Sequence, residues 1–413
     1  MRDTASVQGK VDSRAMREIN RSIVLDIIRR GGKVSRTDLA KRSALTKPTV
    51  SAIVDDLLAR GIVQEVGYGR TMGSGGRRAR LLEFNDASAA YLGIRFGVRT
   101  TQVGIADARG GLRVVREIPS APSEPERAVR EALALVDSLL AEANLPRERL
   151  QSAGVAIPAL VSRSGVVELA PNLNFKQLPL RELVQEGLGL PVVVMNDTHA
   201  GALAEGRCGA ARGVRSFVWV QVGTGVGAGI VIDGKVFHGH VGFSGEIGHC
   251  PVIADGPVCS CGLRGCLEAV ASGWAIRRAA DAAVASGEAS LLAAPGCDRE
   301  ARAVAEAARA GDAVACRILS DVGAYLGMGI STLVNLLNPE MIVLGGGVMS
   351  APDHIIEAAQ TSMAKHALRG ADVRIVPGML GERVGLVGAL LGAMDLSVRS
   401  LRVVAGREHA ALE

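Results

Sequence analysis

Hydrophobic residues near the start of the chain recur at helical spacing in three separate stretches. The first predicts a helix over residues 14–30, and a pair of glycines ends it. The second predicts a short helix that begins with a capping box at Ser35. The third predicts a helix that begins near Thr46, carries Pro48 in its first turn, where a missing N–H costs nothing, and ends at Gly61.

The second and third helices are joined by a tight turn, which is the form of a helix-turn-helix motif. In that motif the N-terminal end of the later helix contacts DNA bases. This end carries Lys47, Thr49 and Ser51, whereas the acidic Asp55 and Asp56 lie toward the other end. An approach to DNA phosphates requires this polarity, so we expect the three polar side chains to contact DNA.

Two short strand-like stretches follow, over residues 62–66 and 81–84, with a glycine-rich basic loop between them. This pattern predicts a hairpin with a flexible basic tip, the wing of a winged helix. Four arginines in and just after the loop are expected to contact phosphates or enter the minor groove: Arg70, Arg77, Arg78 and Arg80. A small helical protein-docking domain is the alternative, but helix order, polarity and the basic wing together favour DNA binding.

Charge is distributed unevenly along the chain. Residues 1–85 hold 17 basic and 9 acidic side chains, a net charge of +8, whereas the rest holds 30 and 33, a net charge of −3. A solvated arginine-rich surface would give the same count, so charge alone does not identify a partner. Together with the helix pattern it favours an anionic polymer, and hence a DNA-binding domain over residues 1–85.

From about residue 90 the pattern changes to short strands alternating with alanine-rich helices, which indicates an α/β fold with two similar halves. The predicted strands cover residues 91–96, 102–107, 112–118, 151–157, 192–195, 217–222, 229–232, 341–344 and 373–376. The predicted helices cover residues 124–143, 198–211, 265–284, 298–310, 312–337, 351–365 and 383–394.

Other features of the chain exclude some classes of protein. No run of eighteen uncharged apolar residues occurs, which argues against a membrane span. The N-terminus has no apolar segment of the kind a signal peptide needs, so we expect a cytoplasmic protein. The cysteines number seven, and three lie close together, which in that compartment favours metal binding over disulfides.

The strongest local motif in the chain is His249-x9-Cys259-x-Cys261-x4-Cys266. Three thiolates and one imidazole suit tetrahedral Zn²⁺ and leave no open position, so the predicted zinc is structural. Glycines between the last two cysteines allow the chain to bend around the ion. Cys250 competes as a ligand, and a set of reduced, unliganded cysteines is the alternative.

Polar residues recur close to this motif and after a buried-looking strand. Asn172 lies in a short polar stretch, Asn196 and Asp197 follow the strand, and Glu246 and Glu268 flank the cysteine motif. A single such residue after a strand is usually a helix cap. Several of them around a metal motif favour a sugar site, because a sugar needs acceptors and amides that converge on several hydroxyls.

Residues 90–395 resemble the ROK family (repressors, open reading frames and sugar kinases), whose members have an actin-like, RNase-H-like fold of two lobes. The resemblance rests on Glu246-Ile-Gly-His249, the Cys259-x-Cys261-Gly-x-x-Gly-Cys266-x-Glu268 zinc signature, Val194-Met-Asn-Asp197 and the glycine turn within 222–229. With the winged helix-turn-helix in front, the chain is similar to the repressor branch, which includes xylose-, glucose- and N-acetylglucosamine-linked regulators. Residues 396–413 carry no motif and are expected to form a C-terminal tail.

The resemblance implies roles for individual residues of this chain. It implies that sugar hydroxyls are contacted by Asn196, Asp197, Glu246, His249 and Glu268, with Asn172 near the pocket. Asp197 matches the catalytic base of the kinases, which takes a proton from the sugar hydroxyl. His249 would contact both the metal ion and the sugar.

The chain also departs from the kinases of this family. Arg95 stands where the kinases carry an acidic residue, and Val98-Arg99 replaces a small Gly-Thr turn that handles Mg²⁺ and ATP phosphates. Ala159 replaces a glycine expected near the sugar. Because phosphoryl transfer depends on a metal ion for charge neutralisation, a guanidinium in place of the carboxylate should eject Mg²⁺. The sequence therefore predicts a retained sugar pocket and a degenerate ATP site.

The leading hypothesis is a sugar-responsive repressor of carbohydrate genes, without kinase activity, that binds palindromic operator DNA as a homodimer or tetramer. The ligand would be a monosaccharide or a sugar phosphate. An ATP-dependent sugar kinase with a regulatory DNA-binding head is the alternative from the enzyme class. A scaffold whose heads are controlled by a membrane-transporter protein is a third hypothesis.

Overall fold

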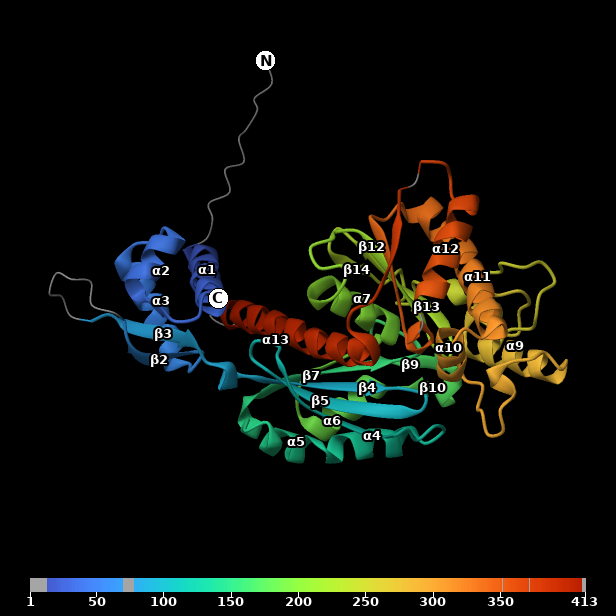
Figure 1. The fold of residues 1–413 in the computed structure, drawn as a ribbon. Coiled ribbons are helices and arrows are strands. Elements are labelled where there is room, and N and C mark those ends of the chain that lie inside the picture. Colours follow the sequence, from blue (N-terminus) through green and yellow to red (C-terminus); the bar gives the residue numbers. More distant parts are fainter. Residues whose placement is uncertain (1–12, 70–77, 351, 371, 411–413) are drawn as a thin grey trace, which may run out of the picture. The chain divides into compact units, whose positions relative to one another are not determined.

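The computed structural model describes residues 13–69, 78–350, 352–370 and 372–410, and its chain forms two compact units (Figure 1). The head unit comprises the chain up to Ala90 together with residues 106–111 and 145–150. The body unit comprises residues 91–105, 112–144 and 151 onward. Two short segments that are distant in sequence therefore belong to the head unit.

The head unit contains the three helices that the hydrophobic pattern predicts: α1 (Ser13–Gly31), α2 (Arg36–Ser43) and α3 (Lys47–Ala59). The capping box at α2 is confirmed, because the Ser35 side chain accepts from the backbone N–H of Asp38 while the Asp38 carboxylate accepts from that of Ser35. The helix-turn-helix prediction is thereby confirmed in its local geometry.

Three strands complete the head unit: β1 (Val34–Ser35), β2 (Val63–Tyr68) and β3 (Arg80–Phe84), in the order β1-β3-β2. The β2–β3 hairpin confirms the two predicted strands of the wing, whose tip over residues 70–77 lies outside the described residues. The strand β1 was not predicted. Apolar residues of all three helices and of the sheet share one core, made of Val24, Ile28, Val34, Leu39, Val50, Ile53, Val54, Leu57, Val63, Leu82 and Phe84. Ala108, from the second segment of the unit, is buried in the same core.

The body unit contains two five-stranded sheets of equivalent topology. The first has β4 (Ala90–Phe96), β5 (Thr100–Asp107), β6 (Leu112–Pro119), β7 (Leu150–Ile157) and β11 (Val192–Asn196) in the order β11-β7-β4-β5-β6. The second has β12 (Phe217–Val222), β13 (Val226–Ile232), β14 (Lys235–Phe237), β15 (Met341–Gly345) and β16 (Arg374–Pro377) in the order β14-β13-β12-β15-β16. In each sheet the third, second, first, fourth and fifth strands along the chain lie side by side, so the prediction of two similar halves is confirmed.

A small third sheet was not predicted. It consists of β8 (Leu160–Val161), β9 (Val167–Ala170) and β10 (Phe175–Leu178) in the order β10-β9-β8. Its strands are short and lack strict alternation, so they carry little signal in the sequence.

The helices of the body cover both sheets. They are α4 (Pro125–Ala134), α5 (Val136–Glu142), α6 (Leu180–Leu188), α7 (Asp197–Cys208), α8 (Leu267–Ala271), α9 (Gly273–Ala285), α10 (Ala301–Arg309), α11 (Ala313–Leu337), α12 (Pro352–His366) and α13 (Val384–Ala410). The prediction of one helix over 265–284 is wrong in two places. Gly265 has φ +73° and belongs to the preceding loop, and Ser272 is extended and caps α9.

The helices α7 and α13 connect the two sheets within the body. Ala156 of β7, Ala200 of α7 and Ala389 of α13 pack together and are fully inaccessible to solvent. On its other side α7 contacts β12 and β13 of the second sheet. Figure 1 shows α4 and α5 on the face of the first sheet opposite α13. The start of α7 is therefore held between the two sheets.

Two helices concern the predictions of no membrane span and of a C-terminal tail. The helix α11 is long and apolar enough to cross a membrane by composition alone, but much of it packs into the core of the second sheet. The helix α13 continues to Ala410, through most of the stretch expected to be a tail.

Candidate functional site

The cysteine motif folds into a compact loop between a single 3-10 turn, Ile247–His249, and the start of α8. The backbone of Pro251 bridges that of Cys266, so the two ends of the loop are held together. Gly265 is required there, because a Cβ atom would lie 1.8 Å from the Ile253 carbonyl oxygen. Local backbone constraints therefore place the motif's side chains before any ion binds.

The structure brings the four predicted ligands together: the Nδ1 or Nε2 atom of His249 and the Sγ atoms of Cys259, Cys261 and Cys266 lie within 4.8 Å of one another. The Sγ atoms of Cys261 and Cys266 are 3.8 Å apart, and Cys259 Sγ lies 3.7 Å from His249 Nδ1. Tetrahedral Zn²⁺ with Zn–S bonds of about 2.3 Å needs S···S separations of about 3.8 Å, so the donor set fits zinc.

Two further observations define this candidate metal centre. Cys250 is exposed and does not belong to the group, so among the described residues the ligand set is the predicted one. Burial raises the pKa of the Cys266 thiol to about 12, and the neighbouring thiols add to the effect. A bound cation would be needed to hold such a thiol as a thiolate.

Asp197 lies at the first position of α7, where β11 ends, and is buried. Burial raises the pKa of its carboxyl, while the positive charge of Arg95 and a hydrogen bond from Gln221 act in the opposite direction. The donor in that bond is Gln221 Nε2, 2.5 Å from Asp197 Oδ2. The carboxylate is thus oriented by a donor from β12, and the charge of Arg95 is close enough to act on it.

Glu246 and Glu268 lie near Asp197 and the cysteine loop. Burial raises the pKa of Glu246 to about 7, and the negative charges of Asp197 and Glu268 contribute. The Glu268 carboxylate accepts from the backbone of Val226 at 3.1 Å and from Ser260 Oγ at 2.8 Å. Glu268 therefore connects the cysteine loop to the glycine turn at the start of β13.

His249 connects the candidate metal group to these acids. Its Nε2 atom lies 4.0 Å from a carboxylate oxygen of Glu246, while its Nδ1 atom lies next to Cys259 Sγ. One ring nitrogen is available to a metal ion while the other points toward Glu246, an arrangement typical of metal-bound histidines. The predicted double role of His249 remains a prediction.

The two asparagines that were predicted to contact sugar are not part of the cluster of acids. Asn196 is the N-cap of α7: its Oδ1 atom accepts from the backbone and hydroxyl of Thr198, and its Nδ2 atom donates to the Ala159 carbonyl. Asn172 is exposed on a short 3-10 helix, Pro171–Leu173. No interaction joins Asn172 to the acid cluster in the described part of the chain. Sugar contacts by both residues remain predictions.

Sequence reasoning missed several residues that support this cluster, among them Gln221, Ser260 and a histidine pair. His199 Nε2 lies 3.1 Å from both the carbonyl and the hydroxyl oxygen of Ser244, two residues before Glu246, and His238 Nδ1 lies 3.3 Å from His199 Nδ1. Burial lowers the pKa of His199 to about 4. In the sequence, only the position of His199 two residues after Asp197 indicated that it could lie near the site.

The predicted DNA-contacting residues lie in the head unit. Lys47 is exposed at the start of α3, and Thr49 and Ser51 are partly exposed. The Thr49 hydroxyl bonds the Thr46 hydroxyl at 2.8 Å, so it also serves the helix cap. Arg78 is exposed at the base of the wing. Arg70 and Arg77 lie outside the described residues.

The acidic residues of α3 are neutralised by neighbouring arginines. Arg36 of α2 pairs with Asp55 at 2.7 Å, and Arg60 pairs with Asp56 at 2.8 Å. The acidic end of the helix is thus paired with arginines of the head, while the first turn of α3, which begins at Lys47, contains no acidic residue.

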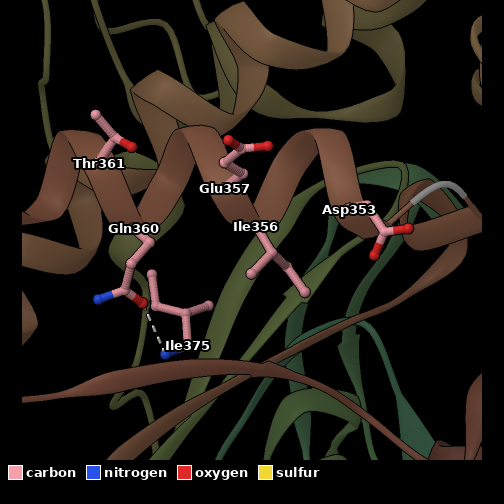
Figure 2. Close-up of a pocket in the computed structure, with 6 residues that line it drawn as sticks. All are labelled: Asp353, Ile356, Glu357, Gln360, Thr361 and Ile375. Carbon is pink, nitrogen blue, oxygen red and sulfur yellow. Dashed lines mark hydrogen bonds between the residues drawn. The ribbon is translucent and has the colours of Figure 1, made fainter.

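A shallow hollow lies between α12 and β16, away from the acid cluster (Figure 2). Gln360 there accepts from the backbone N–H of Ile375 and donates to the Val373 carbonyl, so its amide serves the strand. Asp353 and Glu357 of the same helix also line the hollow (Figure 2). The hollow shares none of its lining residues with the cluster of acids.

Comparisons with known proteins match both units. The ROK family profile matches residues 91–395, and the MarR family profile matches residues 19–69. A putative xylose repressor of Caldicellulosiruptor sp. (strain Rt8B.4) is 32% identical over 381 residues, covering 91% of this chain and 95% of that protein.

Solved structures give the same result. The crystal structure of a ROK family transcriptional regulator, homologous to the E. coli Mlc protein, has a TM-score of 0.78 and 30% identity, covering 94% of this chain and 99% of that one. A ROK family glucokinase from Streptomyces griseus, in complex with glucose and AMPPNP, has a TM-score of 0.66 and 30% identity, covering 74% and 100%. The chain therefore belongs to the ROK family, and its similarity to repressors extends through the winged helix-turn-helix head, which places it in the repressor branch.

Proposed function

We propose that this protein is a sugar-responsive transcriptional repressor without kinase activity. The head unit binds operator DNA through the start of α3 and the wing, and the body binds a monosaccharide beside Asp197 and Glu246. The observation that carries the proposal is the positive charge of Arg95 acting on Asp197, in a chain that also has a helix-turn-helix.

The absence of kinase activity follows from charge. Transfer of a phosphoryl group from ATP relies on Mg²⁺ to neutralise the phosphates and on a base that accepts the hydroxyl proton. Asp197 has the place of that base, but Arg95 supplies a fixed positive charge where the kinases have an acid. A divalent cation next to a guanidinium is disfavoured, since like charges repel.

The proposal includes a structural zinc ion held by His249, Cys259, Cys261 and Cys266. The ion would fix the loop that carries His249 and Glu268, and with four protein ligands it has no position for substrate. We also propose a cytoplasmic homodimer that binds a palindrome with half-sites about 34–36 Å apart, or a multiple of that distance. Sugar binding would change the separation of the two heads, so that they no longer match the spacing of the half-sites.

The test uses the full-length protein and duplexes selected from a random pool. Selected duplexes should be palindromic, and a bound sugar from a monosaccharide panel should weaken binding by about 5- to 150-fold in a fluorescence anisotropy titration. The variant Lys47→Ala should bind the duplex more weakly while its sugar affinity is unchanged.

An assay of ADP release with ATP, Mg²⁺ and the same sugar panel should give no turnover. Sugar-dependent ADP release would instead support the alternative of a sugar kinase with a regulatory head. A protein that ignores every duplex at low ionic strength would contradict the proposal.

A further inference from the structure

Arg95 has a guanidinium without a direct partner. It lies near the end of β4 and is half-buried. In the part of the chain that the structure describes, no acceptor lies within hydrogen-bond or ion-pair distance of its guanidinium. Because the residue is only half-buried, its N–H donors stay open to solvent or to a ligand. Such a group is suited to a ligand that supplies acceptor atoms.

Two glycines leave room for this side chain. A Cβ atom at Gly97, in the turn after β4, would lie 3.0 Å from Arg95 Nη1. A Cβ atom at Gly385, at the start of α13, would lie 2.8 Å from Arg95 Cδ and 2.9 Å from Nε. The side chain is therefore packed against backbone from two elements, so the guanidinium is held in place before any ligand binds.

Arg95 also belongs electrostatically to the acid cluster. Its charge acts on Asp197, and the charges of Asp197 and Glu268 act on Glu246. The cluster therefore has a cationic end at Arg95 and a hydroxyl-binding end at Glu246. A neutral sugar would use only the second end, whereas a ligand that carries an anion at one end of a polyol matches both.

We infer that Arg95 is an anion-binding subsite that takes the phosphate group of a phosphorylated monosaccharide, whose hydroxyls are bound beside Asp197 and Glu246. The inference deepens the proposed function and rests on it. A guanidinium binds phosphate oxygens through two parallel N–H···O bonds, which a compact ammonium group cannot reproduce. A single guanidinium matches one phosphoryl group, not the triphosphate of a nucleotide with its metal ion.

The test is isothermal titration of the full-length protein with glucose, glucose 6-phosphate, xylose, xylose 5-phosphate and inorganic phosphate. The wild type is compared with the variants Arg95→Met and Arg95→Lys. The matched control is Arg99→Met, because Arg99 lies four residues away but is exposed and paired with Glu300 at 2.7 Å.

At least one phosphorylated sugar should bind the wild type tenfold or more tightly than its neutral parent. Arg95→Met should abolish that difference between the phosphorylated and the neutral sugar, and Arg95→Lys should restore only part of it. Arg99→Met should bind like the wild type. The phosphorylated sugar that binds more tightly should also dissociate the selected duplex more effectively than its neutral parent does.

Two results would overturn the inference and are distinguishable from each other. If the neutral sugar binds as tightly as its phosphate, or if Arg95→Met retains the preference, the subsite is wrong while the proposed repressor stands. If no sugar or sugar phosphate binds and none affects the duplex, the proposed function itself fails.

Discussion

The head unit and the body unit present their candidate residues in opposite ways. In the head, Lys47, Thr49 and Ser51 are close in sequence and at least partly exposed at one helix end. In the body, Arg95, Asp197 and the cysteine loop come from distant parts of the chain and are partly or fully buried. DNA contact thus depends on one helix, whereas the body site depends on the packing of β4, α7 and the cysteine loop.

This difference predicts that substitutions in the two units should have different effects. A change to the body cluster should affect stability and ligand response together, because those side chains are held by the core around them. A change to an exposed arginine of the head should alter DNA affinity and leave the fold intact.

The largest effect is expected from Cys261→Ser, which removes one of the four clustered ligands. The variant should lose one equivalent of zinc per chain, measured by plasma mass spectrometry, and about 4 kcal/mol or more of stability in the body's unfolding transition. The sugar response of DNA binding should be lost as well.

The control for that experiment is Cys250→Ser, because Cys250 is exposed and adjacent in sequence to a ligand but outside the group. It should keep its zinc and its stability. Full zinc occupancy in Cys261→Ser would refute the ligand set.

An intermediate effect is expected from the protonation of His199. Burial lowers the pKa of this side chain to about 4. The unfolded chain binds the proton near pH 6.5 and the folded chain does not, so this contribution is fully present above pH 6.5 and is lost as the pH falls toward 4. Between pH 7.5 and 5 the wild type should lose about 2 kcal/mol more than His199→Asn, measured by denaturant unfolding. The exposed His240 is the control, and equal pH dependence of the wild type and His199→Asn would contradict the burial argument.

The smallest effect is expected from the wing. Replacing Arg77 and Arg78 by Ala should weaken binding to the selected duplex by about tenfold and lower the salt dependence, d log K/d log [salt], by about 2, because two phosphate contacts are lost. The control is the double variant Arg130→Ala and Arg302→Ala, which removes two exposed arginines of the body. An unchanged salt dependence would count against contact between the wing and DNA. A shifted unfolding transition would contradict the prediction that exposed arginines of the head do not affect the fold.

The sequence by itself determined the local features of this protein. The capping box at Ser35, the first-turn proline of α3 and the glycine-rich wing depend on interactions between near neighbours, so their residues specify them directly. The cysteine loop was also predictable, because its four ligands lie within eighteen positions and suit one ion. The motifs that identified the ROK family were of the same local kind.

Only the tertiary structure decided which side chains face one another across the body. Nothing in the spacing of Arg95 and Asp197 along the chain indicates that one charge acts on the other, or that Gly385 of α13 makes room for the arginine. The roles of Asn196 as a helix cap and of Gln221 as a donor to Asp197 likewise follow from packing. The physical reason is that contacts between distant segments depend on how whole sheets and helices stack, which the period of a single segment does not encode.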